Sequence, residues 1–128
     1  GDPMRADDFR IAFELELIRN GYAPGRKPGE YVFPPGYPVD TDRSVVNGYT
    51  YRNRARMFLI RRYVSPELDE YLYRELLPLR SGSFGMGGLM WSVWGPTPEQ
   101  LLDRLPVIID LDRRSRFYPD NAVDRSDR

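Results

Sequence analysis

Hydrophobic residues recur at helical spacing near the start of the chain. Phe9, Phe13 and Leu17 follow one another at steps of four residues, with acidic residues before them and Asn20-Gly21 after them. Steps of four place side chains on one face of an α-helix, acidic residues favour its first turn, and Asn-Gly favours its end. The pattern predicts a helix over residues 7–19.

Two further helices are indicated by their starting residues. Ser65 is an N-cap residue followed by proline, and we expect a helix from there that Pro78 stops. The sequence Thr97-Pro98-Glu99-Gln100 matches a capping box, in which the first and fourth residues bond to each other's backbone N–H groups. We expect a short helix to follow and to end at Pro106, because proline interrupts helical hydrogen bonding.

Runs of β-branched and aromatic residues between polar or glycine-rich flanks predict strands. Four segments have this character: 31–33, 56–64, 89–94 and 107–111. Residues 34–55 are expected to be mostly irregular, and the glycine-rich segment 81–88 to be a loop. Together these elements predict an α+β domain, with a small, mostly antiparallel sheet and about three helices packed around it.

The absence of two residue types limits the chemistry. The 128 residues include no cysteine and no histidine. Disulfides, thiolate metal sites, cysteine nucleophiles and histidine-based catalysis are therefore excluded, and no metal site is expected. Any catalysis must use carboxylates, arginine, tyrosine, hydroxyls, amides or the backbone.

Charge and hydropathy limit the partners. Nineteen basic and nineteen acidic residues balance to a net charge of +0, so no general attraction to nucleic acid is expected. No apolar run approaches the roughly 20 residues of a membrane span, so none is expected here. We expect residues 1–4 to be a tag remnant, 5–118 a single toxin-like domain and 119–128 a polar tail.

Two segments have the composition of ligand-binding loops. Residues 29–44 join a short aromatic strand to proline turns and then to Asp42-Arg43-Ser44. In the segment from Phe84 to Gly88, glycines let backbone N–H groups approach a phosphate closely, because no side chain intervenes. The residues alone also fit a proline-rich surface connection and a simple turn.

Together the two segments resemble the tuberculosis necrotizing toxin family, whose domains hydrolyse NAD. That family has a Gly-x-aromatic-aliphatic-x-Pro-x-Gly-x-Pro stretch, an Arg-Ser or Arg-Ala pair and, later, Phe-Gly, a glycine cluster and an aromatic residue. The first stretch is matched, with one extra residue before the arginine, by Gly29, Tyr31, Val32, Pro34, Gly36, Pro38 and Arg43-Ser44. The later segment resembles Phe84-Gly85, Gly87-Gly88 and Trp91, so the resemblance covers residues 17–110 approximately.

The resemblance implies an NAD(P)-cleaving glycohydrolase toxin domain that releases nicotinamide, with NAD or NADP as substrate and no required cofactor. It also implies a bacterial secreted effector, delivered into a target cell as part of a larger polypeptide, with an immunity protein as a candidate partner. The substrate-binding residues implied are Arg19, Tyr31, Arg43, Phe84, Gly85, Gly87, Gly88 and Trp91, and the catalytic residues are Arg43, Asp42 and Ser92. Arg43 would bind phosphate, and Asp40 or Asp42 would orient water.

The chain departs from the family at its catalytic glutamine. The two positions that fit this residue are Leu89 and Met90, and neither side chain can replace an amide. Three interpretations stay open: loss of NAD hydrolysis, use of a neighbour such as Ser92 or Asp42, or a related reaction on a related nucleotide.

Three other functions are compatible with the sequence. The first is a catalytically silent nucleotide-binding or protein-binding domain on the same scaffold. The second is a histidine-free ribonuclease toxin that uses arginines, which the balanced charge disfavours. The third is an immunity protein, which would bind a toxin rather than a small ligand.

Overall fold

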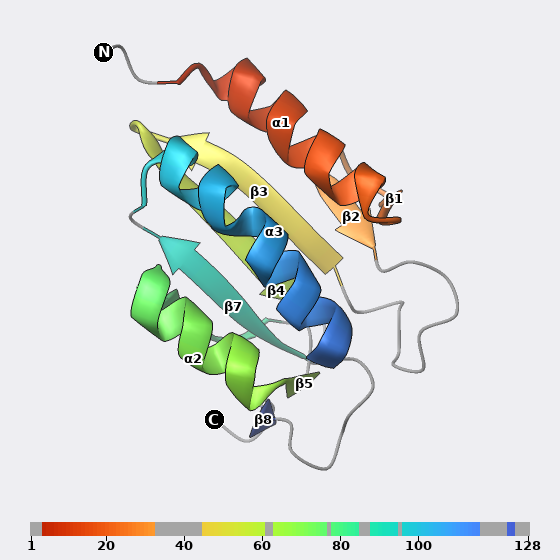
Figure 1. The fold of residues 1–128 in the computed structure, drawn as a ribbon, viewed down its shortest axis with the longest axis vertical. Coiled ribbons are helices and arrows are strands. Elements are labelled where there is room, and N and C mark those ends of the chain that lie inside the picture. The colour runs from red at the N-terminus through yellow and green to blue at the C-terminus, as the bar shows by residue number, and fades with distance from the viewer. Residues whose placement is uncertain are drawn as a thin grey trace.

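The computed structural model describes residues 4–32, 45–60, 63–76, 78–84, 88–94, 96–115 and 123–124. Within these residues the chain forms three helices (Figure 1): α1 (Ala6–Arg19), α2 (Pro66–Glu75) and α3 (Pro98–Ser115). The strands are β1 (Ala23–Pro24), β2 (Glu30–Val32), β3 (Val45–Tyr51), β4 (Arg54–Ile60), β5 (Tyr63–Val64), β6 (Pro78–Phe84), β7 (Gly88–Trp94) and β8 (Val123–Asp124).

The strands form two antiparallel sheets. The larger sheet has six strands in the order β1-β2-β3-β4-β7-β6, and the smaller one pairs β5 with β8. Every neighbouring pair is antiparallel. The predicted α+β class, an antiparallel sheet with three helices, is confirmed.

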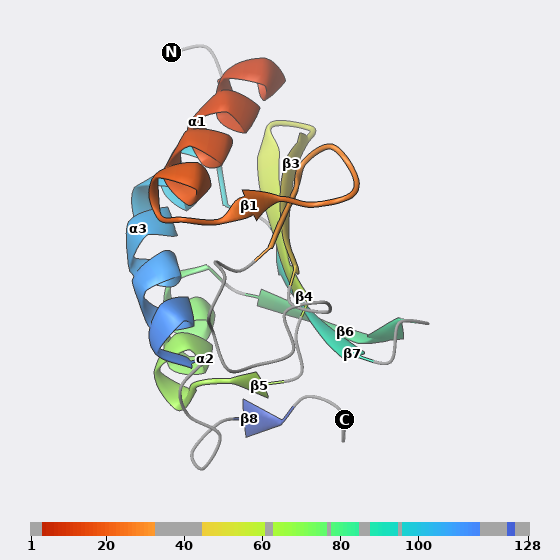
Figure 2. The ribbon, with the colours of Figure 1, turned by 90° about the vertical axis from the view of Figure 1, so that its right-hand side faces the viewer.

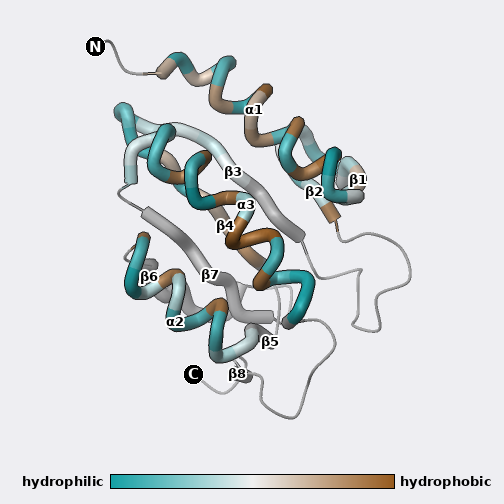
Figure 3. Tube along the Cα trace, in the orientation of Figure 1, coloured by the Kyte–Doolittle hydropathy of each residue, from teal (hydrophilic) through white to brown (hydrophobic). Residues whose placement is uncertain are grey.

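The helices lie on one side of the six-stranded sheet, as the edge-on view in Figure 2 shows. Hydrophobic and hydrophilic residues alternate along them (Figure 3). The buried hydrophobic residues of the helices and one side of β4 make a single core, which includes Phe9, Phe13, Leu17, Ala55, Met57, Leu59, Leu68, Leu72, Leu101, Leu105 and Ile108. No helix in the part of the chain described here is both long and apolar enough to cross a membrane.

The local signals at two helix starts are confirmed. Ser65 Oγ accepts a hydrogen bond from the backbone N–H of Leu68 at 3.1 Å, as an N-cap does. Thr97 Oγ1 accepts from the Gln100 N–H at 3.1 Å, and Gln100 Oε1 accepts from the Thr97 N–H at 2.8 Å. This reciprocal pair is the predicted capping box.

The strand predicted at 107–111 is wrong, because α3 continues through Pro106 to Ser115. Proline inside a helix costs roughly 3 kcal/mol, whereas burying one leucine or isoleucine side chain contributes about 1.5–3 kcal/mol. Leu105, Ile108 and Ile109 are buried, and Pro106 is exposed to solvent. The free energy gained by burying these side chains along α3 therefore exceeds the cost of placing a proline inside the helix.

The expectation that residues 34–55 are mostly irregular missed β3 and the start of β4. The two strands are joined by a tight turn in which Arg52 and Asn53 have positive φ angles of 49° and 65°. Positive φ at both central residues is typical of the two-residue turn that matches strand twist. Residues 34–44 of that prediction lie outside the described residues.

Two other segments differ from the predictions, and one helix end agrees with them. In the segment 81–88, expected to be a loop, the chain completes β6 at Phe84 and begins β7 at Gly88. The second helix ends at Glu75, before Pro78, as expected, and Pro78 is also the first residue of β6. The single strand predicted over 56–64 is divided into β4 and β5, and β5 pairs with β8 in the segment expected to be a polar tail.

Candidate functional site

One end of the six-stranded sheet is marked by a row of paired backbone positions. Val32 of β2 pairs with Val45 of β3, Val45 pairs with Ile60 of β4, and Ile60 pairs with Met90 of β7. We call the part of the molecule beyond this row the loop end of the sheet.

Both segments that resemble nucleotide-binding loops leave the sheet at this loop end. The chain departs after Val32 and returns at Val45, so segment 33–44 begins and finishes there. Phe84 pairs with Gly88, two residues beyond Met90 along β7, so segment 85–87 is anchored at the same end. One strand separates Val45 from Met90, which corresponds to about 10 Å at the usual strand spacing. Gly88 lies two residues, roughly 7 Å, further along β7 than Met90. The anchors of the two segments therefore share one end of the sheet although they are far apart in sequence.

Several predicted site residues belong to those connecting segments. Asp40, Asp42, Arg43, Gly85 and Gly87 lie outside the described residues. Their roles stay predictions, and only the positions of the strands on either side of them are known.

Four predicted site residues occupy defined backbone positions in the β6–β7 hairpin. Phe84 and Gly88 form its closing pair. Trp91 pairs with Leu59 on one side and Arg80 on the other. Ser92 pairs with Phe58 and Leu79, so it is two residues further from the loop end than Met90.

Tyr31, predicted as a stacking wall, lies in the core. Its side chain is only 4% exposed, and its ring meets Phe13 edge-on with a centroid separation of 6.2 Å. Burial raises the pKa of the Tyr31 hydroxyl above the ordinary value of 10.0, and the negative charge of Glu14 adds to the rise. The ring packs α1 against β2 in this structure.

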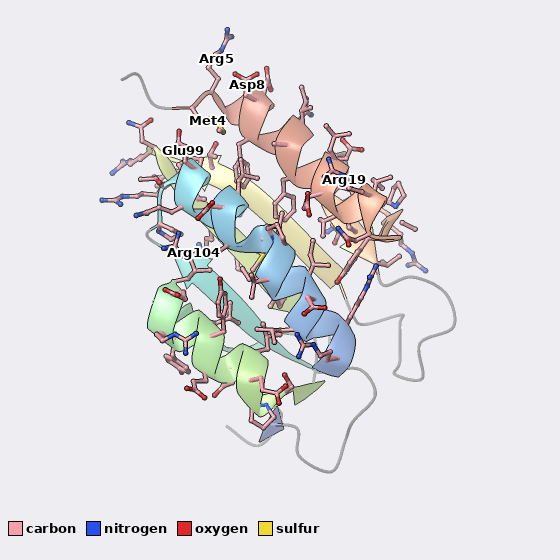
Figure 4. All side chains as sticks on the ribbon, viewed as in Figure 1. Met4, Arg5, Asp8, Arg19, Glu99 and Arg104 are labelled. Atoms are coloured by element: carbon pink, nitrogen blue, oxygen red, sulfur yellow. The ribbon has the colours of Figure 1, made fainter. Side chains whose placement is uncertain are left out.

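Arg19, the second predicted phosphate ligand, is on the last turn of α1 and labelled in Figure 4. Its side chain is 71% exposed and makes a 3.4 Å ion pair with Glu16. After α1 the chain enters β1, where Ala23 pairs with Val32. The helix end that carries Arg19 is therefore connected directly to the loop end of the sheet.

A buried polar junction at the end of α1 was missed by the sequence analysis. The Tyr22 hydroxyl donates a hydrogen bond to Asp112 Oδ2 at 2.9 Å, and both residues are buried. Arg113 donates through Nη2 to the backbone carbonyl of Asn20. Asp112 follows Leu105 by seven residues and Ile108 by four, which is one helical face. That signal was hidden because the helix was expected to stop at Pro106.

The described residues include no cluster of carboxylates suited to a metal ion, since no group of three or more Asp and Glu residues among them is arranged to hold one.

The junction of Tyr22 and Asp112 ties the end of α3 to the turn after α1 and so fixes the helix end that carries Arg19. Ile60 is followed in the sequence by Arg61 and Arg62, two cations not considered in the sequence analysis.

The geometry and the motif similarity are separate observations. The register of β2, β3, β4 and β7 brings together the anchors of segments 33–44 and 85–87. The toxin-family similarity rests on the short motifs within and around those segments. No protein-family model matches this chain, and no match was found among curated proteins or solved structures.

Proposed function

We propose that this domain binds NAD or NADP at the loop end of its sheet and hydrolyses the bond to nicotinamide. The observation that supports the proposal is that the described strand ends on either side of the two segments lie at the same end of the sheet. Segment 33–44 carries Arg43 and is anchored in the row of paired strand residues at Val32 and Val45. Segment 85–87 carries two glycines and is anchored just beyond the same row. A dinucleotide needs a cation for its diphosphate and close backbone approach for its other polar groups.

In this proposal each residue type has a defined role. Arg43 binds the diphosphate by paired hydrogen bonds, and Arg19 at the end of α1 is the second phosphate ligand. The amides of Gly85, Gly87 and Gly88 face a phosphate or the nicotinamide carboxamide. Phe84 and Trp91 are the candidate stacking residues, and Tyr31 supports the site from the core.

The proposed chemistry needs no histidine. The bond between the anomeric carbon and the positively charged nicotinamide ring breaks, and the ring leaves as a neutral molecule. Water adds to the anomeric carbon and loses a proton to solvent or to Asp42, which gives ADP-ribose, nicotinamide and one proton. The transition state resembles the oxocarbenium ions of glycoside cleavage, so positioning and electrostatic stabilisation supply the catalysis. Ser92 is the second candidate for holding the water.

A silent nucleotide-binding domain is the second candidate. It is favoured by Leu89 and Met90, which stand where the resembling family has its glutamine. Leu89 pairs with Ser83 of β6, and Met90 pairs with Ile60 of β4, so both backbones belong to the sheet. On this alternative the loop end binds a nucleotide without cleaving it.

Delivery into a target cell as part of a larger secreted polypeptide belongs to the same proposal, as does an immunity partner. Both follow from the family resemblance of the two segments. Co-purification of the domain with the product of a neighbouring gene would test the partner.

Binding and turnover are tested together in three proteins: the parent chain, Arg43→Gln, and Arg10→Gln as a matched control. Arg10 is exposed on α1 and pairs with Asp7 at 3.7 Å. We expect NAD or NADP to raise the melting temperature of the parent and the control, with a smaller rise in Arg43→Gln. Chromatography should detect nicotinamide released by the parent and the control.

The outcomes separate the candidates. Binding with release of nicotinamide supports the hydrolase. Binding without release rejects the hydrolase and supports the silent domain. No shift with either dinucleotide rejects both.

A further inference from the structure

Strands β3 and β4 form a hairpin, and the side of this hairpin that faces away from the helices carries aromatic rings and arginines. On β4 the buried residues Ala55, Met57 and Leu59 belong to the core with the helices. Residues alternate between the two sides of a strand, so Arg56 and Phe58 lie on the other side, and both are half-buried. Figure 2 shows the helices gathered on one side of β3 and β4.

The same alternation places two tyrosines of β3 beside them. A Cβ atom on Gly48 would lie 2.6 Å from the ring of Phe13 in α1, so Gly48 faces the helices. Tyr49 and Tyr51 therefore face away, and they are 39% and 49% exposed. Two residues along a strand correspond to about 7 Å, so the two rings stand at successive positions on one surface.

The rings and arginines are held in contact with each other. The rings of Tyr49 and Phe58 stack with a centroid separation of 5.9 Å and an interplanar angle of 27°. The Arg56 guanidinium lies 4.6 Å from the Phe58 ring centroid and donates to the Tyr49 hydroxyl at 3.3 Å. These contacts fix a positive charge directly over an aromatic surface.

The turn of the hairpin repeats the arrangement. The Arg52 guanidinium lies 5.2 Å from the ring centroid of Tyr51. Tyr51 pairs with Arg54 across the strands, and Tyr49 pairs with Arg56. We call Tyr49, Tyr51, Arg52, Arg54, Arg56 and Phe58 the aromatic–arginine face.

Charge is distributed unevenly in this neutral chain. Between residues 43 and 66 the sequence contains six arginines and no Asp, Glu or Lys, although the whole chain has a net charge of +0. The hairpin itself contributes Arg52, Arg54 and Arg56. The local field at this face is therefore positive, which the overall balance conceals.

We propose that the aromatic–arginine face binds single-stranded nucleic acid. Exposed rings on an open sheet offer flat surfaces on which unpaired bases stack, and arginines beside them neutralise backbone phosphates and also stack. A duplex hides its base faces within the stack, so the two tyrosines add nothing to duplex binding. This surface is on the hairpin, distinct from the loop end, and the inference is independent of the dinucleotide proposal.

The inference is tested by fluorescence anisotropy with a labelled twelve-residue single strand, as RNA and as DNA, and with the matching DNA duplex. The variants are Tyr51→Ala and Arg52→Gln, both at exposed side chains. Their controls are Tyr73→Ala, an exposed tyrosine of α2, and Arg10→Gln on α1. Circular dichroism confirms that each variant is folded.

We expect saturable binding of at least one single strand, weakened about five-fold or more by Tyr51→Ala, since a stacked base contributes on that scale. Arg52→Gln should reduce the slope of log affinity against log salt by roughly 0.7, the value for one phosphate on a single strand. Tyr73→Ala and Arg10→Gln should match the parent. A higher affinity for the RNA or for the DNA strand shows which of the two the aromatic–arginine face binds.

Three results would overturn the inference. The first is no binding of either single strand at low salt. The second is duplex binding as tight as single-strand binding, with no effect of Tyr51→Ala, which indicates polyelectrolyte attraction alone. The third is failure of the oligonucleotides together with binding of polyglutamate that Tyr51→Ala abolishes, which would assign the face to an acidic protein.

Discussion

Tyr22 and Asp112 are 90 residues apart in sequence, yet the tyrosine hydroxyl donates a 2.9 Å hydrogen bond to the aspartate carboxylate. Asp112 is only 1% exposed. A buried polar group needs a hydrogen-bond partner, because without one it loses its free energy of hydration and gains nothing in return. The pair therefore requires the end of α3 and the turn after α1 to be correctly placed together.

Tyr22→Phe should lower the free energy of unfolding by about 1.5–3 kcal/mol, the range for a hydrogen bond to a charged group. Urea unfolding of the purified chain measures this change. Tyr73→Phe, at an exposed position on α2, should change stability by less than about 0.5 kcal/mol. Equal effects of the two substitutions would show that the Tyr22 hydroxyl has no special role.

Gly48 of β3 lies close to α1. A Cβ atom there would lie 2.6 Å from Cζ and 2.8 Å from Cε2 of Phe13, whose ring is buried. Gly48→Ala should therefore destabilise the domain by about 1–3 kcal/mol through overpacking. Combining it with Phe13→Leu should give a smaller total loss than the sum of the two single losses, because the clash is shared. Additive losses in this double-mutant cycle would contradict the close approach.

Pro106 interrupts the hydrogen bonding of α3 from an exposed position. Pro106→Ala should raise the free energy of unfolding by about 1–3 kcal/mol, because it restores an N–H donor and removes a ring clash. Thermal and urea unfolding both measure the gain. If residues 107–111 formed a strand, alanine at 106 would bring no such gain, and a loss of stability would contradict the continuous helix.

The alkaline limb of the stability curve depends on two tyrosines with raised pKa values. Burial is the main cause of the raised pKa of both Tyr31 and Tyr71. Above about pH 10 the unfolded chain loses these protons before the folded chain does, so the free energy of unfolding falls as pH rises towards the folded-state pKa. Below that pH both states keep the proton and the contribution is constant.

Tyr31→Phe and Tyr71→Phe should each reduce this alkaline loss, since phenylalanine has no proton to release. Urea unfolding at about pH 9 and about pH 11 measures the loss in the parent and in each variant. A loss in both variants equal to that of the parent would contradict the role of these buried hydroxyls.

Local sequence signals predicted the helix starts well. Ser65 and Thr97 act through bonds to residues three positions away, so their geometry is contained in a few adjacent residues. The fold class followed from the same signals together with the hydrophobic runs. Boundaries that depend on distant packing could not be found in this way.

Pro106 and β3 show why the rest was missed. A proline predicts a helix end locally, but the buried stripe of α3 depends on α1, α2 and β4, which are distant in sequence. In β3, Gly48 weakens the strand signal, and the reason for a glycine is the ring of Phe13, 35 positions earlier. The positive φ angles of Arg52 and Asn53 were likewise hidden, because arginine is an unusual residue for such a turn.

The candidate site was predicted as two segments without a relation in space. Sequence reasoning proposed Arg43 and the glycines near Phe84 as site residues, and their roles stay predictions. Only the strand register shows that the anchors of their segments share one end of the sheet. Asp112 and the aromatic–arginine face were missed. The first depends on the length of α3, and the second depends on which side of β3 and β4 the helices cover.

A crystal structure of the chain soaked with millimolar NAD tests the central claim most directly. The account predicts density for the dinucleotide at the loop end, with its diphosphate against Arg43 and its other end against the segment from Phe84 to Gly88. Packed side chains filling the space between these segments, or NAD bound elsewhere on the molecule, would contradict it.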